Sequence, residues 1–445
     1  MEDRPVSDRD LTALTATEAA AEIARNVISA EDYMQACLDR IAALDDKIHA
    51  FVHLDRDHAL KQARERDAHK AEGKPLGILH GIPVGIKDIF DTADYPTECG
   101  AAPMAGRRPQ VDSAAVRKLR DAGAVIIGKT VTTECAYFHP GKTRNPHDVT
   151  RTPGGSSSGS AAAVAAAMVP LAIGSQTNGS MIRPAAFCGV FGMKPTHGLI
   201  SRAGALPLSR ALDHVGAFAR SLDDLALILD ALVGHDPEDP DTKSYAPLDF
   251  RAGLAEPPPI PPIYAFVRTP VWDKADADAR SGIEDIAKDL GAREIDMPDH
   301  YREAWDAQRA IMAADMAYNL GPLVDKGGDI SRQLQDFIAE GRKVTAVAYQ
   351  AALRDARRYR AAMTEIFEQY ADAIITLSAR GIAPTGTATG DPAFCSFWTL
   401  TGLPALNLPI LQGENNLPIG VQLVGAQGRD ARLLRTARAM LTALG

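Results

Sequence analysis

Cysteine is scarce and scattered in this chain. Its 445 residues include five cysteines, an odd number, and no Cys-x-x-Cys pair occurs. This argues against a disulfide framework and against a zinc site, and favours buried free thiols in a reducing compartment. We therefore expect a cytoplasmic protein without a bound metal. The five residues are Cys37, Cys99, Cys135, Cys188 and Cys395.

Long apolar runs and blocks of like charge are also missing. No stretch of 18 apolar residues occurs, and the longest candidate, residues 161–173, is interrupted by Pro170. The opening residues 1–5 are charged and show no apolar signal segment. The formal net charge is -9, whereas nucleic acids and anionic membranes attract basic patches. Neither kind of partner is expected.

The apolar pattern instead predicts an α/β protein. Thr15-x-x-Glu18 and Ser29-x-x-Asp32 resemble capping boxes, and a third helix is expected near residues 59–71. Short buried strands are then expected at 81–86, 124–127, 171–173, 404–410 and 420–424. Helices are expected between them at 113–122, 158–168 and 222–232, and at the end over 430–444. This alternation predicts a mixed, mainly parallel central sheet covered by helices on both faces.

The chain is expected to hold one core with two additions. Residues 1–75 form an N-terminal helical segment that packs on the core, and residues 76–445 form a single α/β unit. The Pro- and Asp-rich stretch 236–262 predicts a long connection without helix or strand. Residues 300–372 are helical in pattern, so about 240–390 is interpreted as a variable, mostly helical elaboration.

Two loops rich in glycine and serine carry the strongest functional signal. They are Pro153–Ser160 and Gly174–Ser180. Small residues let a backbone approach a ligand closely, and successive N–H groups in such a turn can converge on one oxyanion. From composition alone, a plain turn, a linker or a phosphate-binding loop are the alternatives. The Walker A spacing at 123–130 is accidental, because its middle reads as a strand.

A nucleophilic serine needs a base. The eleven histidines are dispersed, and the three nearest to the loops, His80, His197 and His214, are interpreted as structural hydrogen-bonding residues. Lys87 follows the apolar run 81–86 and so emerges from an expected core strand. A lysine can serve as a base where burial lowers its pKa, whereas pairing with Asp88 or simple solvation are the alternatives.

Taken together, four segments resemble the amidase signature family. Residues 81–88 resemble its lysine strand, residues 154–157 the loop of its bridging serine, and residues 177–180 its nucleophile turn. Residues 184–189 with 194–196 resemble the stretch that follows. The resemblance covers about 10–235 and 393–444, and it implies the amidase signature fold and a hydrolase of carbon–nitrogen bonds that needs no cofactor.

The resemblance also implies a role for each catalytic position. Ser180 would attack the amide carbonyl and carry an acyl-enzyme, and Ser156 would bridge Ser180 to an uncharged Lys87, with the Gly155–Ser156 peptide in the cis form. The backbone N–H groups of the turn would form the oxyanion hole; they belong to Thr177, Asn178, Gly179 and Ser180.

Departures from the family pattern point to a free-standing amidase, similar to aryl acylamidases and urethanases. Gln176 stands where an acidic residue is common, Asn178 stands where glycine is common, and Arg183 lies one place later than the family's arginine. We therefore expect neutral hydrogen bonds near the turn in place of a salt bridge.

The substrate side rests on apolar and aromatic candidates. They are Val131, Tyr137, Phe138, Phe394, Phe397 and Trp398, and for each of them core packing is an equal alternative. If several line the site, aryl or apolar amides or carbamates are the expected small-molecule substrates. A monomer or homodimer is expected. The alternatives are a non-catalytic binding protein on the same fold and a glutamine-dependent amidotransferase subunit.

Overall fold

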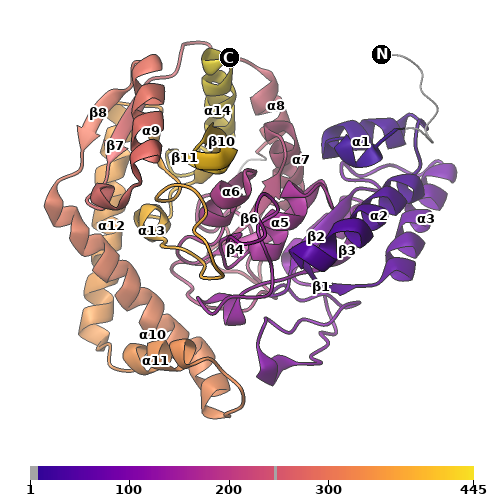
Figure 1. Ribbon diagram of the computed structural model, residues 1–445, viewed down its shortest axis with the longest axis horizontal. Helices are drawn as coiled ribbons and strands as arrows, with labels where there is room; N and C mark the ends of the chain where they lie inside the picture. The colour runs from indigo at the N-terminus through magenta and orange to yellow at the C-terminus, as the bar shows by residue number, and fades with distance from the viewer. Residues whose placement is uncertain (1–8, 245–247) are drawn as a thin grey trace.

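The strands that the structure describes form one sheet. The computed structural model describes residues 9–244 and 248–445, and within them eleven strands pair in the order β1-β3-β2-β4-β6-β5-β10-β11-β9-β7-β8 (Figure 1). The strands are β1 (Phe51–Leu54), β2 (Pro83–Lys87), β3 (Val125–Thr130), β4 (Leu171–Gln176), β5 (Phe191–Lys194), β6 (His214–Ala219), β7 (Tyr264–Arg268), β8 (Arg293–Asp296), β9 (Ala373–Leu377), β10 (Ala405–Gln412) and β11 (Pro418–Val424).

The sheet is mixed, as expected, but the expectation that it is mainly parallel is wrong. Of the pairings in the described sheet, β2 with β3 and β4, and β7 with β8 and β9, are parallel. The other six are antiparallel. One reason is visible between β10 and β11, where residues 413–417 leave room for a hairpin and none for a crossover helix.

Helices flank this sheet. They are α1 (Ala16–Ala24), α2 (Ala30–Ile48), α3 (Arg56–Ala71), α4 (Ala114–Asp121), α5 (Ser158–Ala165), α6 (Ile182–Cys188), α7 (Leu222–Leu232), α8 (Phe250–Ala255), α9 (Ala277–Asp289), α10 (Glu303–Asp325), α11 (Arg332–Gly341), α12 (Ala346–Gln369), α13 (Ala393–Leu400) and α14 (Asp430–Leu444). Both predicted capping boxes are present, at Thr15 and at Ser29. The closing helix has the predicted bounds.

The two additions to the core are less purely helical than expected. The N-terminal segment contributes β1, which pairs with β3 through register partners such as Phe51 and Thr130. The stretch interpreted as irregular contains the short helix α8, which begins after the N-cap Asp249. The elaboration at 240–390 supplies β7, β8 and β9, so it widens the sheet as well as adding α10 to α12.

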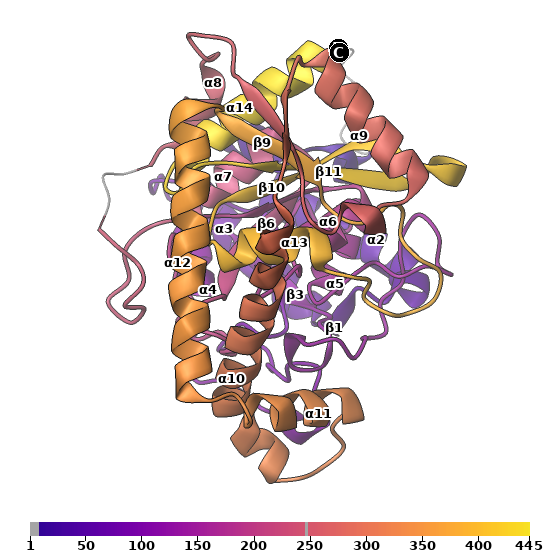
Figure 2. The same cartoon turned by 90° about the vertical axis from the view of Figure 1, so that its left-hand side faces the viewer.

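The long helices of the elaboration lie side by side over the carboxyl-terminal half of the sheet. Figure 2 shows α10 and α12 running together, with α11 across their far ends. Helix α13 packs against α10 and carries residues toward the turn at 177–180, as described below. This contact is what places the elaboration over the candidate site.

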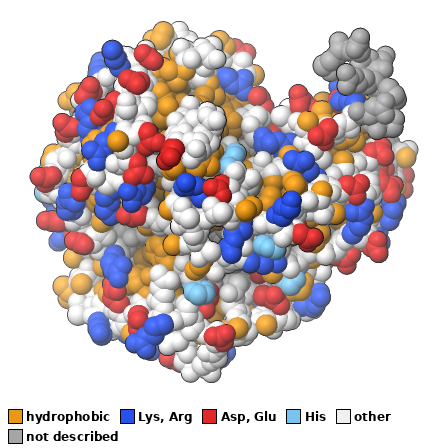
Figure 3. All heavy atoms as spheres, in the orientation of Figure 1, with side chains coloured by type: hydrophobic (Ala, Val, Ile, Leu, Met, Phe, Trp, Pro, Cys, Tyr) orange, Lys and Arg blue, Asp and Glu red, His pale blue; other side chains and the backbone are white. Residues whose placement is uncertain are grey.

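The face of the molecule shown in Figure 3 has no large patch of purely acidic or purely basic side chains. In Figure 3, acidic and basic side chains are interspersed over that face. Within the described ranges, no helix is both long enough and apolar enough to cross a membrane.

Candidate active site

Lys87 is the last residue of β2, a strand that is buried along its whole length. Its neighbours β3 and β4 run parallel to it, so the carboxyl ends of β2 and β4 meet at one edge of the sheet. This brings Lys87 next to Ser175, the penultimate residue of β4. Sheet topology therefore places the lysine side chain at the entrance to the turn that follows β4.

The ammonium position of Lys87 is surrounded by hydroxyl groups. Its Nζ lies 2.7 Å from Ser156 Oγ, 3.0 Å from Ser157 Oγ and 2.8 Å from Ser175 Oγ. The side chain is fully buried, and it forms no ion pair with any residue in the described ranges. Burial lowers its pKa well below 10.5, although the more distant carboxylate of Asp213 acts in the opposite direction. The amine is thus held under conditions that favour its neutral form.

Lys129 provides the comparison within the same sheet. It is also fully buried, one strand away on β3, but its Nζ lies 3.1 Å from the carboxylate of Asp88. The suggested pairing of Asp88 with Lys87 is therefore wrong, since the partner of Asp88 is Lys129. Of these two buried lysines, only the one with a carboxylate partner has its charge compensated.

The serine loop approaches Lys87 from the start of α5. Ser157 is the N-cap of that helix, and the preceding Gly155–Ser156 peptide is cis, as the resemblance implies. Gly174 on β4 makes the approach possible, because a Cβ at that position would lie 2.7 Å from Ser157 Oγ. The Ser157 hydroxyl donates to the Ser175 carbonyl at 3.2 Å, which ties the loop to β4.

The turn after β4 is organised by Gln176. Its Oε1 accepts the backbone N–H groups of Met181 at 2.8 Å and Ile182 at 3.0 Å, and its Nε2 donates to Thr399 Oγ1 at 2.9 Å. The expected neutral hydrogen bonds are therefore present, and Gln176 caps the start of α6. Ser180 lies inside this turn, with 8% of its surface exposed.

The turn leaves its N–H groups available. None of the backbone N–H groups of Asn178, Gly179 and Ser180 donates to another group within residues 9–244 and 248–445. The Asn178 carbonyl, in contrast, accepts the Thr399 hydroxyl, and this fixes the peptide plane. Free, fixed donors at the end of a turn are the arrangement that an oxyanion hole requires.

The structure joins two of the three predicted catalytic side chains directly. Lys87 and Ser156 are in hydrogen-bond contact. The Ser180 hydroxyl forms no hydrogen bond with any described residue, so the step from Ser156 to Ser180 belongs to the proposal below.

Arg183 supports the serine loop instead of pairing with an acid. Its Nη2 donates to the Gly155 carbonyl at 2.7 Å, and its guanidinium lies 5.8 Å from the centre of the Phe138 ring. Burial lowers its pKa to about 10. The three histidines behave as predicted, since each bonds to a backbone carbonyl: His80 to Arg66, His197 to Arg210 and His214 to Leu212.

Most of the candidate substrate residues lie in the core. On α13, Phe394, Phe397 and Trp398 are 2% exposed or less, and Phe397 packs against the rings of Tyr301, Trp305 and Tyr359. Val131 is buried beneath the start of α5, where its carbonyl accepts the N–H of Gly159. For these four residues the placement agrees with core packing, the alternative given above.

Tyr137 does line a cavity next to the turn. This outer cavity has a volume of about 280 Å³. Its polar and charged lining residues are Asn178, Lys274, Asp306, Gln308, Arg309, Asp391 and Ser396. Its apolar lining residues are Tyr137, Phe138, Trp305, Met312, Phe337, Pro392 and Ala393. The Tyr137 and Phe337 rings are stacked with centres 4.7 Å apart. An aromatic wall therefore lies close to the free N–H groups of the turn.

Sequence reasoning missed the polar face of α13. Ser396 donates to Asn178 Oδ1 at 2.6 Å and Thr399 donates to the Asn178 carbonyl, so residues three apart hold the turn. A spacing of three residues places Ser396 and Thr399 on one face of a helix. The aromatic residues between them were instead interpreted as the functional face of α13. Ser157 and Ser175 were also missed as lysine partners, because only the fold brings them to Lys87. Within the described ranges, no cluster of three or more His, Cys, Asp or Glu could hold a metal ion.

Comparison with known proteins identifies the family of the chain. The family model "Amidase" matches residues 32–434. The chain is 35% identical to a glutamyl-tRNA(Gln) amidotransferase subunit from Salinispora arenicola, with 98% of each sequence covered.

Two solved structures are also similar to this chain over nearly its whole length. Native peptide amidase from Stenotrophomonas maltophilia is 30% identical, covers 97% of this chain and 96% of its own, and superposes with a TM-score of 0.83. A 6-aminohexanoate cyclic dimer hydrolase in complex with its substrate is 28% identical, covers 98% of both chains and has a TM-score of 0.87. The chain therefore belongs to the amidase signature family and is a hydrolase of carbon–nitrogen bonds.

Proposed function

We propose that the protein hydrolyses amide bonds through a relay of Ser180, Ser156 and Lys87, with an acyl-enzyme on Ser180. The observation that carries the proposal is the buried Lys87 amine with three hydroxyl neighbours and no carboxylate partner among the described residues. An amine in that setting can accept a proton at neutral pH, which an exposed or paired lysine cannot do.

The hydrogen-bond partners indicate where the lone pair of the amine points. A neutral amine has two N–H groups and one lone pair. The Ser157 hydroxyl donates to the Ser175 carbonyl, so it accepts one N–H from Lys87. With the second N–H donated to Ser175, the lone pair is left for the hydroxyl of Ser156. Ser156 can then pass its proton to Lys87 and receive one from Ser180.

The chemistry then follows in two halves. Ser180 Oγ bonds to the amide carbon while its proton moves to Ser156, whose own proton moves to Lys87. The oxyanion is stabilised by the N–H groups of the turn. The relay returns the proton to the nitrogen as the carbon–nitrogen bond breaks, which the poor leaving group needs. Water then attacks the acyl carbon while the same relay takes up its proton. The ester bond to Ser180 breaks, the relay returns the proton to Ser180 Oγ, and the acid is released.

The outer cavity supports aryl amides or carbamates as substrates. It adjoins Asn178 and offers the stacked rings of Tyr137 and Phe337. Charged side chains also line it, namely Lys274, Asp306, Arg309 and Asp391. A flat ring gains both apolar burial and ring–ring contact on such a wall. The Asn178 amide, oriented by Ser396, can donate to a polar atom near the scissile bond.

Replacing Tyr137 by leucine is expected to reduce the preference for aryl substrates. The test compares kcat/KM on anilides, aryl carbamates and aliphatic primary amides of matched acyl group. We expect the natural protein to favour the aryl members and the Tyr137→Leu variant to lose about tenfold on them, with little change on aliphatic amides, because one ring contact and part of the wall are removed.

The matched control is Tyr318→Leu, which makes the same change at a tyrosine that is 84% exposed on α10. It should leave the preference unaltered. Equal turnover of aryl and aliphatic amides by the natural protein would contradict the aryl assignment while leaving amide hydrolysis in place.

A glutamine-dependent amidotransferase subunit is the second candidate, because the relative from Salinispora arenicola carries that name. Such a subunit would release ammonia from glutamine and copurify with partner chains. Anilide hydrolysis by the isolated chain, without glutaminase activity, would decide against it.

A further inference from the structure

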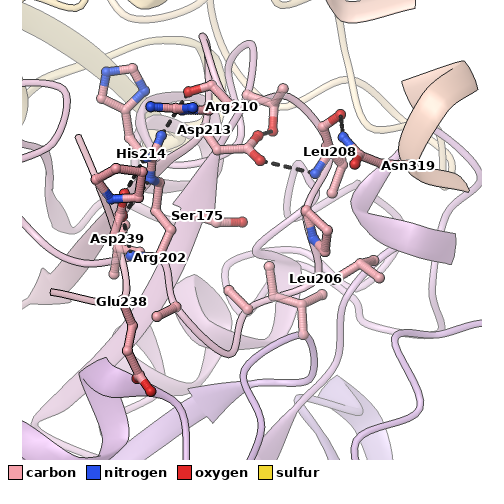
Figure 4. A pocket seen from close by; sticks show the side chains of 17 residues that line it. Ser175, Arg202, Leu206, Leu208, Arg210, Asp213, His214, Glu238, Asp239 and Asn319 are labelled. Carbon is pink, nitrogen blue, oxygen red and sulfur yellow. Dashed lines mark hydrogen bonds and ion pairs between the residues drawn. The ribbon is translucent and has the colours of Figure 1, made fainter. Parts of the chain in front are cut away.

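A second cavity lies on another side of the catalytic residues. This inner cavity, of about 230 Å³, is lined in part by Ser175, Thr177 and Asp213, with Ile89, Leu206 and Leu208 among its apolar residues. Figure 4 shows the Ser175 hydroxyl directed into it, between Asp213 and Leu206 in that view. Ser180 and Asn178 do not line it. The inner cavity thus touches the relay through the hydroxyl that contacts Lys87.

Asp213 is the buried acid of this cavity. It precedes β6, and its carboxylate accepts the Thr177 hydroxyl at 2.6 Å and the N–H groups of Leu208 and Ser209 at 2.9 Å each. The two N–H bonds anchor the carboxylate on the 208–213 loop. The third bond extends from this anchor to the first residue of the nucleophile turn.

Thr177 is held from two directions. Its hydroxyl is bound by Asp213, and its carbonyl accepts Gln308 Nε2 of α10 at 3.2 Å. Because Thr177 begins the turn that ends at Ser180, its position sets where the free N–H groups point. Donors that are misplaced by a fraction of an ångström stabilise the oxyanion less well.

Other charged groups surround Asp213. Those that line the inner cavity or act on the carboxylate across it are Lys87, Arg202, Arg210, His214, Glu238 and Asp239. Asp315 of α10 approaches the same loop by accepting the Ser209 hydroxyl. Arg202 is already paired with Asp239 and Asp241, so it does not neutralise Asp213 by direct contact. Burial raises the pKa of Asp213 to about 6.

We propose that Asp213 is a positioning residue for the hydrolysis: it fixes the nucleophile turn through Thr177, and it shares the inner cavity with the Ser175 hydroxyl that contacts Lys87. The inference rests on the proposed function and adds a residue outside the relay. The carboxylate is ionised above about pH 6, and its charge favours the ammonium form of Lys87. Asp213 therefore opposes the neutral amine while it supports the oxyanion hole.

The test separates these two effects with three variants. Asp213→Asn removes the charge and weakens the tether, so kcat should fall about tenfold and the acidic limb of the kcat/KM profile should move to lower pH. The limb moves down because removal of a nearby negative charge lowers the pKa of Lys87. Thr177→Val removes the tether alone, so kcat should fall about as much without a shift of the limb. Thr177→Ser keeps the hydroxyl and should restore kcat.

The control is Glu238→Gln, which removes a charge from the rim of the same cavity at a side chain that is 65% exposed and paired with Arg117. It should change neither kcat nor the position of the acidic limb of the kcat/KM profile. A normal kcat in Thr177→Val would overturn the proposal, and so would an Asp213→Asn variant whose kcat/KM profile against pH matches that of the control. If Asp213→Asn fails to fold, the comparison of Thr177→Val with Thr177→Ser tests the proposal alone. If the natural protein neither hydrolyses amides nor reacts with a fluorophosphonate, the proposed function itself has failed.

Discussion

Alanine at position 180 is expected to lower amide hydrolysis by at least about 10³-fold without altering the fold. The reason is that the Ser180 hydroxyl is the atom that bonds to the substrate in the proposed reaction, whereas it forms no hydrogen bond with any described residue. Its removal therefore costs the reaction its nucleophile and costs the folded state almost nothing. Steady-state kinetics on an anilide and the thermal unfolding midpoint measure the two effects.

Ser29→Ala is the matched control. Ser29 is the N-cap of α2, where its hydroxyl accepts the N–H of Asp32. This variant should lose about 1 kcal/mol of stability and keep its activity. A Ser180→Ala protein that retains more than a few per cent of the hydrolysis would contradict the assignment of the nucleophile.

Methionine at position 87 is expected to abolish activity and to leave the protein at least as stable as the natural chain. Methionine fills similar space but cannot accept a proton, so the relay has no terminus and turnover should fall by about 10³-fold or more. The amine is fully buried without a carboxylate partner in the described ranges, so its desolvation opposes folding. Replacing it by an apolar side chain removes that cost.

Lys129→Met provides the contrast. Its removal leaves the buried carboxylate of Asp88 unpaired, so this variant should be strongly destabilised, by about 3–5 kcal/mol. Unfolding in denaturant, measured on both variants, reports the difference. A Lys87→Met protein that is as destabilised as Lys129→Met would indicate that Lys87 is a charged structural residue.

The parts of the fold that were predictable from the sequence are those with a local cause. The two capping boxes and the closing helix have patterns that no distant contact needs to complete. Strand direction depends on connection length, and the sheet was expected to be mainly parallel because the hairpin between β10 and β11 was not recognised. Helix α8 was missed because prolines on its carboxyl-terminal side obscured its N-cap at Asp249.

The residues of the candidate site also fall into those with a local sequence signal and those that depend on tertiary contacts. Lys87, Ser156 and Ser180 could be predicted as the catalytic residues because each lies in a segment that resembles the amidase signature family. Ser175 and Asp213 were not identified, because their roles arise from the pairing of β2 with β4 and from the 208–213 loop. On α13 the aromatic residues were given weight over Ser396 and Thr399, although the aromatic side faces the core. Hydrophobic side chains identify a buried face but do not indicate what covers it.

A direct titration of the Lys87 amine tests whether this group can accept the proton in the proposed relay. The protein can be labelled with 13C at the lysine ε-carbons, and the Lys87 resonance identified by its loss in Lys87→Met. We predict that this resonance titrates well below the ordinary value of 10.5, and that kcat/KM falls as the pH drops through the same range. A resonance that titrates near 10.5, in a protein that still hydrolyses amides at neutral pH, would contradict the relay.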